Sequence, residues 1–227
     1  MKKTELKKLK RKIVFLLPLG MIIIGLMLFL PAGTFNYWHA WAFMGVMFVP
    51  LLTVVFYFFK KDPELLERRM RNKEKEAKEI IIIKIAKIFF FIGFVFPGID
   101  YRYGWSHVPV WLVVLSDAII FLAYMLIFLV FTENSYTSRI VEVDKKQKVI
   151  TTGPYSIVRH PMYAGIIPMY LLIPLALGSY YAVAFYIPVI VLIFYRIFDE
   201  ERVLCRELYG YKQYMKKVRY RLIPRVW

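Results

Sequence analysis

The stretch RHPMYAGIIPMYLLIPLALGSYYAVAFYIPVIVLIFYRIFDEE, residues 159–201, holds two apolar runs between an Arg-His pair and three consecutive acids. Only Gly178 and Ser179 separate the two runs, and this pair of residues is typical of a turn. We therefore predict two helices that fold back on each other as a tight hairpin. Such a hairpin returns the acids 199–201 to the end of the molecule at which the Arg-His pair lies.

Similar apolar runs fill the rest of the chain. Its 227 residues are 59% hydrophobic and yet carry a formal charge of +16, whereas a soluble domain is about 45–50% apolar. A helix needs about 20 residues to cross the hydrocarbon of a bilayer, and each run comes near that length. We predict an all-α integral membrane protein with five to six transmembrane helices, the last two forming the hairpin. The runs cover residues 13–31, 37–59, 80–97, 109–131, 161–178 and 180–198.

The distribution of charge predicts the orientation in the membrane. Basic residues number seven, eight, five and eight in the segments 2–12, 60–78, 132–160 and 199–227. The remaining connections, 31–36 and 98–108, contain a single basic residue, Arg102. By the positive-inside rule, both termini and both long charged loops are cytoplasmic. Tryptophans gather at the opposite boundary, as expected of an interfacial aromatic belt: Trp38, Trp41, Trp105 and Trp111.

Composition also excludes several other classes. The Lys and Arg residues lie between apolar runs and do not form a stripe, and no nucleic-acid-binding module is apparent, so we expect membrane lipids and not nucleic acid as partners. A single cysteine, Cys205, excludes an internal disulfide. With three histidines in addition, the chain offers too few ligands for a structural zinc site, and we assign no metal site.

The Arg-His pair occupies the start of a helix. Pro161 favours an extended backbone at His160 and suits the first helical position, so His160 is the expected N-cap residue. The amides of the first turn and the helix dipole attract an anion there, and Arg159 adds a bidentate donor. Tyr163 offers a ring and a hydroxyl, while Gly165 removes a side chain where another group approaches.

The acids at the other end of the hairpin supply the opposite charge. Neighbouring residues on a helix diverge by about 100°, so only one of Glu200 and Glu201 can point fully into a shared pocket. Its neighbour is left to orient that pocket or to meet Arg196 one turn earlier. Acids at the C-terminus of a helix oppose its dipole, which indicates that these acids have another role. Donors for an anion thus face carboxylates beside the lipid, as a zwitterionic amino-acid group requires.

The sequence GPYSIVRHPMYAG, followed by Glu200-Glu201 and then LYGYKQYMKKVRYRLIP, resembles the C-terminal signature of the isoprenylcysteine carboxyl methyltransferase and phospholipid methyltransferase superfamily. That signature is an RHPxYxG element, a hydrophobic hairpin and a Glu-Glu pair, and the resemblance covers about residues 130–227. It implies S-adenosylmethionine as cofactor at the cytosolic face and a lipid-like acceptor from the bilayer. The matching residues are Arg159, His160, Pro161, Tyr163, Gly165, Glu200 and Glu201.

We divide the chain accordingly into four N-terminal membrane helices, residues 1–130, and a methyltransferase region, residues 131–227, whose hairpin, loops and tail form the cofactor site. The expected catalytic residues are Arg159, Glu201 and Arg196. To the matching residues, which we expect to bind cofactor, we add Tyr211 and Tyr214 of the tail, where a headgroup-binding surface is the alternative. The expected acceptor-binding residues, with loop capping as the alternative, are Asn134, Tyr136 and Ser138.

Several activities remain open. We favour O-methylation of an isoprenylcysteine-like carboxylate, with N-methylation of a phospholipid amine as the alternative. An NADPH-dependent enzyme similar to the membrane sterol reductases is a second class, although those proteins lead one to expect tryptophan after Tyr209-Gly210, where this chain has Tyr211. A non-catalytic membrane scaffold is the third. The sequence does not identify the acceptor or the oligomeric state, nor does it decide whether the last hairpin crosses the bilayer completely.

Overall fold

The computed structural model describes residues 3–70, 77–137, 143 and 147–227. In these residues the regular structure is helical, which confirms the predicted all-α class. The elements are α1 (Lys3–Ala32), α2 (Trp38–Lys61), α3 (Pro63–Arg69), α4 (Ala77–Tyr103), α5 (Val110–Glu133), η1 (Gly153–Ser156, a 3₁₀ helix), α6 (Pro161–Ala176), α7 (Val183–Glu207) and α8 (Tyr211–Lys217).

Within the described residues, four helices are long and apolar enough to cross a membrane, which confirms a multi-pass membrane protein. They comprise Thr4–Ala32, Trp38–Lys61, Ile80–Tyr103 and Val110–Glu133, and α6 is a shorter apolar helix. The helices α1 and α7 extend beyond the predicted runs 13–31 and 180–198, because a hydropathy pattern marks the apolar section of a helix and not its polar continuation.

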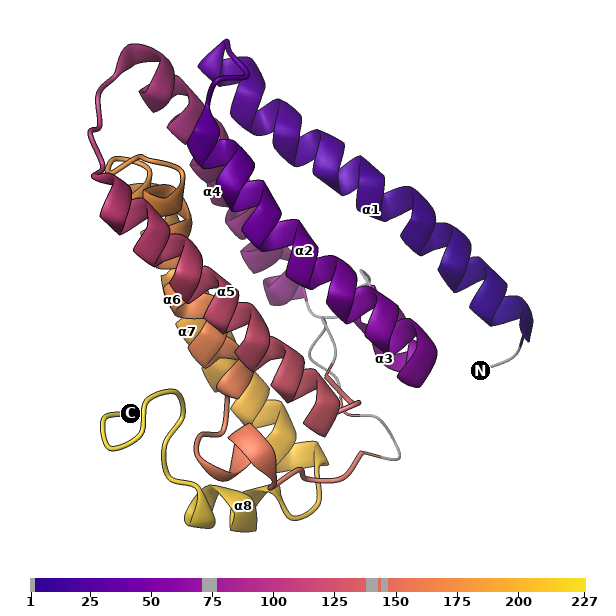
Figure 1. The fold of residues 1–227 in the computed structure, drawn as a ribbon. Coiled ribbons are helices and arrows are strands. Elements are labelled where there is room, and N and C mark those ends of the chain that lie inside the picture. The colour runs from indigo at the N-terminus through magenta and orange to yellow at the C-terminus, as the bar shows by residue number, and fades with distance from the viewer. Residues whose placement is uncertain (1–2, 71–76, 138–142, 144–146) are drawn as a thin grey trace.

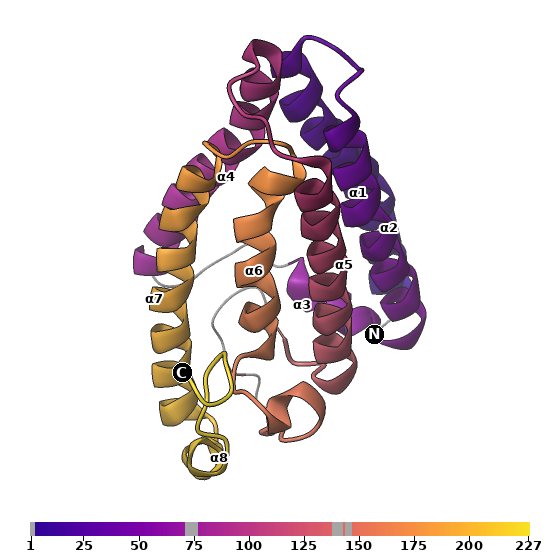
Figure 2. The ribbon, with the colours of Figure 1, turned by 60° about the vertical axis from the view of Figure 1, so that its left-hand side comes forward.

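The long helices run side by side along one axis (Figure 1 and Figure 2). The N-terminus, α3, η1, α8 and the C-terminal tail lie at one end of this bundle, which we call the site end. The connections α1–α2, α4–α5 and α6–α7 lie at the other end, which we call the far end. Alternating connections of this kind place both ends of the α6–α7 hairpin at the site end, as predicted.

Small residues set the distances between the helices. A Cβ atom on Gly93 of α4 would lie 2.6 Å from the ring of Tyr186 on α7, and one on Gly98 would lie 2.5 Å from the carbonyl oxygen of Leu28 on α1. Real Cβ atoms do not approach other atoms so closely, so α4 can pack against both helices only because these positions are glycine. Tyr186 is fully buried in the main apolar core together with Phe94.

A polar cluster joins the connections at the far end. Asp100, buried near the end of α4, accepts hydrogen bonds from the amide and the hydroxyl of Ser106, both at 2.7 Å, and from the hydroxyl of Ser179. Ser179 follows Gly178, whose φ of +76° favours glycine and closes the tight hairpin turn that the sequence predicted. Asp100 thereby fixes the hairpin to the α4–α5 connection, a contact that sequence reasoning missed.

Candidate active site

The predicted helix start is confirmed at the site end. Pro161 is the first residue of α6 and His160 is its N-cap residue, with φ of −123° and ψ of 61° and no capping bond from its side chain. Before it, Gly153, the first residue of η1, adopts a φ of +55°. The amides of Arg159 and His160 donate to the carbonyl oxygens of Tyr220 and Arg221, both at 2.9 Å. The RH motif is therefore paired with the C-terminal tail.

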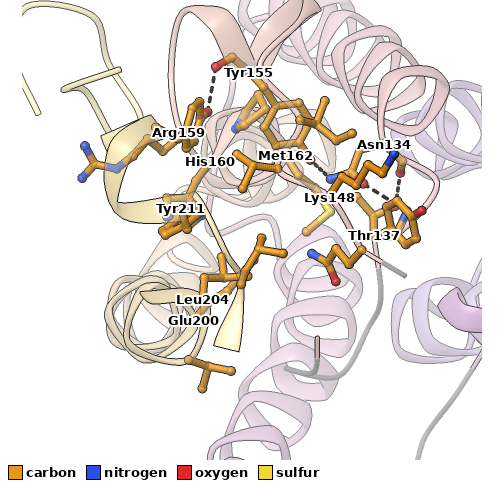
Figure 3. Close-up of a pocket in the computed structure, with 18 of the residues that line it drawn as sticks. Asn134, Thr137, Lys148, Tyr155, Arg159, His160, Met162, Glu200, Leu204 and Tyr211 are labelled. Carbon is orange, nitrogen blue, oxygen red and sulfur yellow. Dashed lines mark hydrogen bonds between the residues drawn. The ribbon is translucent and has the colours of Figure 1, made fainter. Parts of the chain in front are cut away.

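The side chain of Arg159 is buried and forms an ion pair inside the protein. Its Nε donates to Oε1 of Glu201 at 2.7 Å, and its Nη1 donates to the carbonyl oxygens of Val218 and Arg219 at 3.0 and 2.6 Å. Figure 3 shows its guanidinium directed away from Met162. Arg159 thus binds α7 and the tail at the same time.

Glu201 is the centre of this network and lies beyond the apolar run 180–198. Besides Arg159, Nε2 of His160 lies 3.2 Å from its Oε1, and Nε of Arg221 donates to its Oε2 at 2.9 Å. Burial acts to raise the pKa of Glu201, but the hydrogen bonds from His160, Arg159 and Arg221 outweigh burial and lower it to about 2. Glu201 is therefore a carboxylate with three internal partners.

A cavity opens beside this network, between the starts of η1 and α6, the end of α7, and α8 (Figure 3). Glu200 lies on its wall and accepts a hydrogen bond from the hydroxyl of Tyr163 at 3.0 Å. Arg196, one turn earlier on α7, also lines the cavity. The structure thus separates the two acids, because Glu200 lies on the cavity wall and Glu201 points into the ion network. Other predicted residues on the wall are Arg159, His160, Pro161, Tyr211 and Tyr214.

The two tyrosines of α8 differ in their hydrogen bonding. The hydroxyl of Tyr214 donates to the carbonyl oxygen of Tyr155 at 2.7 Å. The hydroxyl of Tyr211 is buried and has no hydrogen-bond partner in the described part of the chain, although the residue is only 4% exposed. Burial raises the pKa of Tyr214 to about 12, and burial together with the nearby carboxylates raises the pKa of Tyr211 further. Both phenols are therefore protonated donors at neutral pH.

The residues expected to bind the acceptor follow α5. Asn134 and Tyr136 both line the cavity, and Ser138 lies outside the described residues. The side chain of Asn134 donates to the hydroxyl of Tyr155 at 3.0 Å and accepts from the amide of Tyr136 at 3.0 Å. Asn134 therefore caps the loop and also forms part of the cavity wall.

Gly165 lies away from the cavity. A Cβ atom at this position would be 3.3 Å from the carbonyl oxygen of Ala123 on α5 and 3.4 Å from the side chain of Ile127. The missing side chain therefore allows α5 and α6 to pack closely, and it does not make room for a ligand.

Sequence reasoning missed several residues on the cavity wall. Residues 147–150 line the cavity, and among them Lys148 lies across the cavity from Tyr211 (Figure 3). Nothing in their composition distinguishes them from an ordinary loop, so only the folded structure reveals them. Tyr155, by contrast, stands inside the quoted GPY motif and could have been singled out there.

Comparisons with known proteins agree with this geometry. Residues 112–206 match the isoprenylcysteine carboxyl methyltransferase (ICMT) family. The fold is similar to that of the eukaryotic intramembrane Ras methyltransferase ICMT, solved without a monobody, with a TM-score of 0.53 and 19% sequence identity over 90% of this chain and 74% of that one. Among curated proteins, no sequence matches. The residues matched by the family model include Arg159, His160 and the Glu200-Glu201 pair.

Proposed function

We propose that this protein transfers a methyl group from S-adenosylmethionine, bound in the cavity at the site end, to a lipid-like acceptor. S-adenosylmethionine is the cofactor of the family whose model residues 112–206 match. The observation that carries the proposal concerns Tyr211, a residue of the cavity wall whose buried hydroxyl lacks a hydrogen-bond partner among the described residues. A buried donor without a partner is unfavourable, so a polar ligand in this cavity stabilises the protein.

The residues on the cavity wall fit the charged portion of this cofactor. The carboxylate of Glu200 accepts hydrogen bonds from an amino group or from ribose hydroxyls, and the hydroxyl of Tyr211 donates to an oxygen. The first turn of α6 presents the positive end of the helix dipole to a carboxylate. When bound, S-adenosylmethionine supplies an electrophilic methyl group on its sulfonium.

The chain's own contribution to catalysis is orientation and exclusion of water. Direct methyl transfer requires no protein nucleophile, and alignment of reactants supplies roughly 7–11 kcal/mol in favourable cases. Arg196 places a positive charge on the cavity wall, where it attracts a carboxylate acceptor. We assign Arg159 and Glu201 as positioning residues, since each binds the other and the elements around the cavity.

The membrane topology follows from the same proposal. We place the site end at the cytosolic face, because the basic segments of the sequence gather there. The apolar hairpin α6–α7 completes the membrane region and brings the number of spans to six. Residues 131–227 then build the site, and residues 1–130 supply the remaining membrane helices, in keeping with a cavity wall that lies within 134–214.

The acceptor that we favour is the free carboxylate of an isoprenylated cysteine. The test is to incubate the purified protein in lipid nanodiscs with methyl-labelled cofactor and either a prenylcysteine analogue or phosphatidylethanolamine. A methyl ester releases its label as methanol in base, whereas an N-methyl group does not. Base-labile label on the prenylcysteine analogue is the expected result, and label only on the amine lipid would replace our acceptor with a phospholipid.

The cofactor site has its own test. Glu200→Gln should weaken S-adenosylmethionine binding measured by calorimetry, because it replaces the anionic acceptor on the wall. Glu207→Gln, at the exposed end of the same helix, is the matched control and should bind normally. Equal affinity in both variants would refute the proposed site.

A further inference from the structure

The outward side of α7 carries an apolar stripe that ends abruptly. Ile187, Val191, Tyr195 and Phe198 recur every three or four residues and are exposed. The next exposed position on this side is Arg202. An apolar face of this period belongs against lipid, and a charged one belongs in water. The boundary between lipid and water on α7 thus falls between Phe198 and Arg202.

The C-terminal tail returns to this boundary. After α8 the chain folds back beside α7 (Figure 1 and Figure 2). The ring of Trp227 packs against those of Phe194 and Phe198, with centroids 5.3 and 5.8 Å apart. The guanidinium of Arg221 lies 5.1 Å from the ring of Phe198 and 5.2 Å from that of Trp227. Tryptophan and arginine at such a level are typical of a membrane interface.

The tail here forms a closed loop whose backbone is largely paired. The amides of Arg221, Leu222 and Ile223 donate to the carbonyl oxygen of Trp227 at 2.9 to 3.1 Å. In return, the amides of Val226 and Trp227 donate to the carbonyl oxygen of Ile223 at 3.1 Å. Backbone groups that approach the hydrocarbon are costly unless they are hydrogen-bonded internally, and this loop provides such bonds for these amides.

The loop turns its apolar side chains outward at the tip. Ile223 and Val226 are 55% and 75% exposed, and Pro224 and Arg225 between them are exposed as well. Its base is fixed, because Leu222 is buried against the apolar cluster of Tyr163, Ile193 and Ile197. A fixed loop that exposes apolar residues next to a lipid-facing stripe extends that stripe.

From these observations we infer that residues 223–227 form an interfacial loop that docks on the lipid bilayer. Ile223 and Val226 enter the boundary between headgroups and acyl chains, and the Arg225 guanidinium binds anionic headgroups. The partner is lipid and not protein, because the loop continues a stripe that already faces the acyl chains. The inference goes beyond methyl transfer and rests on the proposed crossing of the membrane by α7.

The test measures the depth of single fluorescent labels in nanodiscs. Cys205→Ser removes the chain's one cysteine, and Val226→Cys, Val191→Cys and Tyr209→Cys are then introduced separately. All three positions are exposed, at 75%, 60% and 96%. Each variant receives a polarity-sensitive dye and is reconstituted with phospholipids that carry a nitroxide near the headgroup end of the acyl chain. Cofactor binding by each labelled variant confirms that it is folded.

The inference predicts blue-shifted emission and strong nitroxide quenching for the labels at Val226 and Val191, with red emission and little quenching for that at Tyr209. If the Val226 label behaves like the Tyr209 label while the Val191 label is quenched, the loop does not dock on the bilayer. The inference about the loop then fails, while the proposed crossing of the membrane by α7 stands. If the Val191 label is unquenched, α7 does not cross the membrane and the inference fails with that span. A blue-shifted but unquenched Val226 label would show a protein contact and also overturn it.

Discussion

Arg159 and Glu201, which are 42 residues apart in the sequence, form a buried ion pair with 2.7 Å between Nε and Oε1. The pair joins the start of α6 to the end of α7, and Arg159 also binds the carbonyl oxygens of Val218 and Arg219 in the tail. Through this ion pair and its two hydrogen bonds to the tail, Arg159 connects the start of α6, the end of α7 and the C-terminal tail. A residue that organises a site in this way affects stability and ligand binding together.

Glu201→Gln should destabilise the fold strongly. The substitution leaves the buried guanidinium of Arg159 without its counter-charge, and breaking a buried pair by removing one partner costs about 3–5 kcal/mol. Thermal unfolding in detergent measures the loss. Glu200→Gln serves as the control, because Glu200 lies on the cavity wall and accepts a hydrogen bond from the neutral hydroxyl of Tyr163. Similar melting temperatures for the two variants would contradict the role of Glu201 as the centre of the network.

The same carboxylate should make stability depend on pH in the acid range. The pKa of Glu201 falls from 4.5 to about 2 on folding, so its folded form binds fewer protons than its unfolded form between these values. The stabilisation is fully present above pH 4.5 and is lost as the pH falls towards 2. Melting temperatures recorded across this window should decline in the wild-type chain. In Glu201→Gln that part of the decline should be missing, and an unchanged acid profile would count against this assignment.

Tyr211→Phe should have opposite effects on stability and on binding. Among the described residues this buried hydroxyl has no partner, so its removal relieves an unfavourable group and the cofactor-free protein should be unchanged or slightly more stable. Cofactor affinity should fall by about tenfold, the equivalent of one hydrogen bond of about 1.4 kcal/mol. Melting temperature and calorimetric titration measure the two effects. Tyr209→Phe is the control at an exposed site. Unaltered cofactor affinity in Tyr211→Phe would show that the Tyr211 hydroxyl does not bind the cofactor.

Gly93→Ala should destabilise the membrane bundle. The added Cβ would lie 2.6 Å from the ring of Tyr186, so the ring or the helix must move, and overpacking of this kind costs about 1–3 kcal/mol. Gly20→Ala is the matched control, because no atom of the part of the chain that the structure describes lies within 4 Å of its added Cβ, and helix propensity then favours alanine. The midpoint temperature of thermal unfolding should be lower than that of the wild type for Gly93→Ala only. Equal midpoints would show that α4 and α7 are not in tight contact.

Much of the architecture could be predicted from the sequence. The length of an apolar run is fixed by bilayer thickness, so the four long spans could be predicted without knowing their neighbours. Local chemistry likewise marked the start of α6 at Pro161 and the hairpin turn at Gly178, because each depends on the backbone of that residue alone. The motif that resembles the methyltransferases identified the segments that the structure brings together at the cavity.

What only the tertiary structure decided is the direction in which each side chain points. The helical repeat requires Glu200 and Glu201 to diverge by about 100°, but it does not say which of them faces the cavity. That choice depends on the rotation of α7, which is set by the burial of Tyr186, Ile193 and Ile197 against other helices. Likewise, only the contact with α5 shows that Gly165 allows two helices to pack closely. Such contacts join residues far apart in the chain, and so no local pattern encodes them.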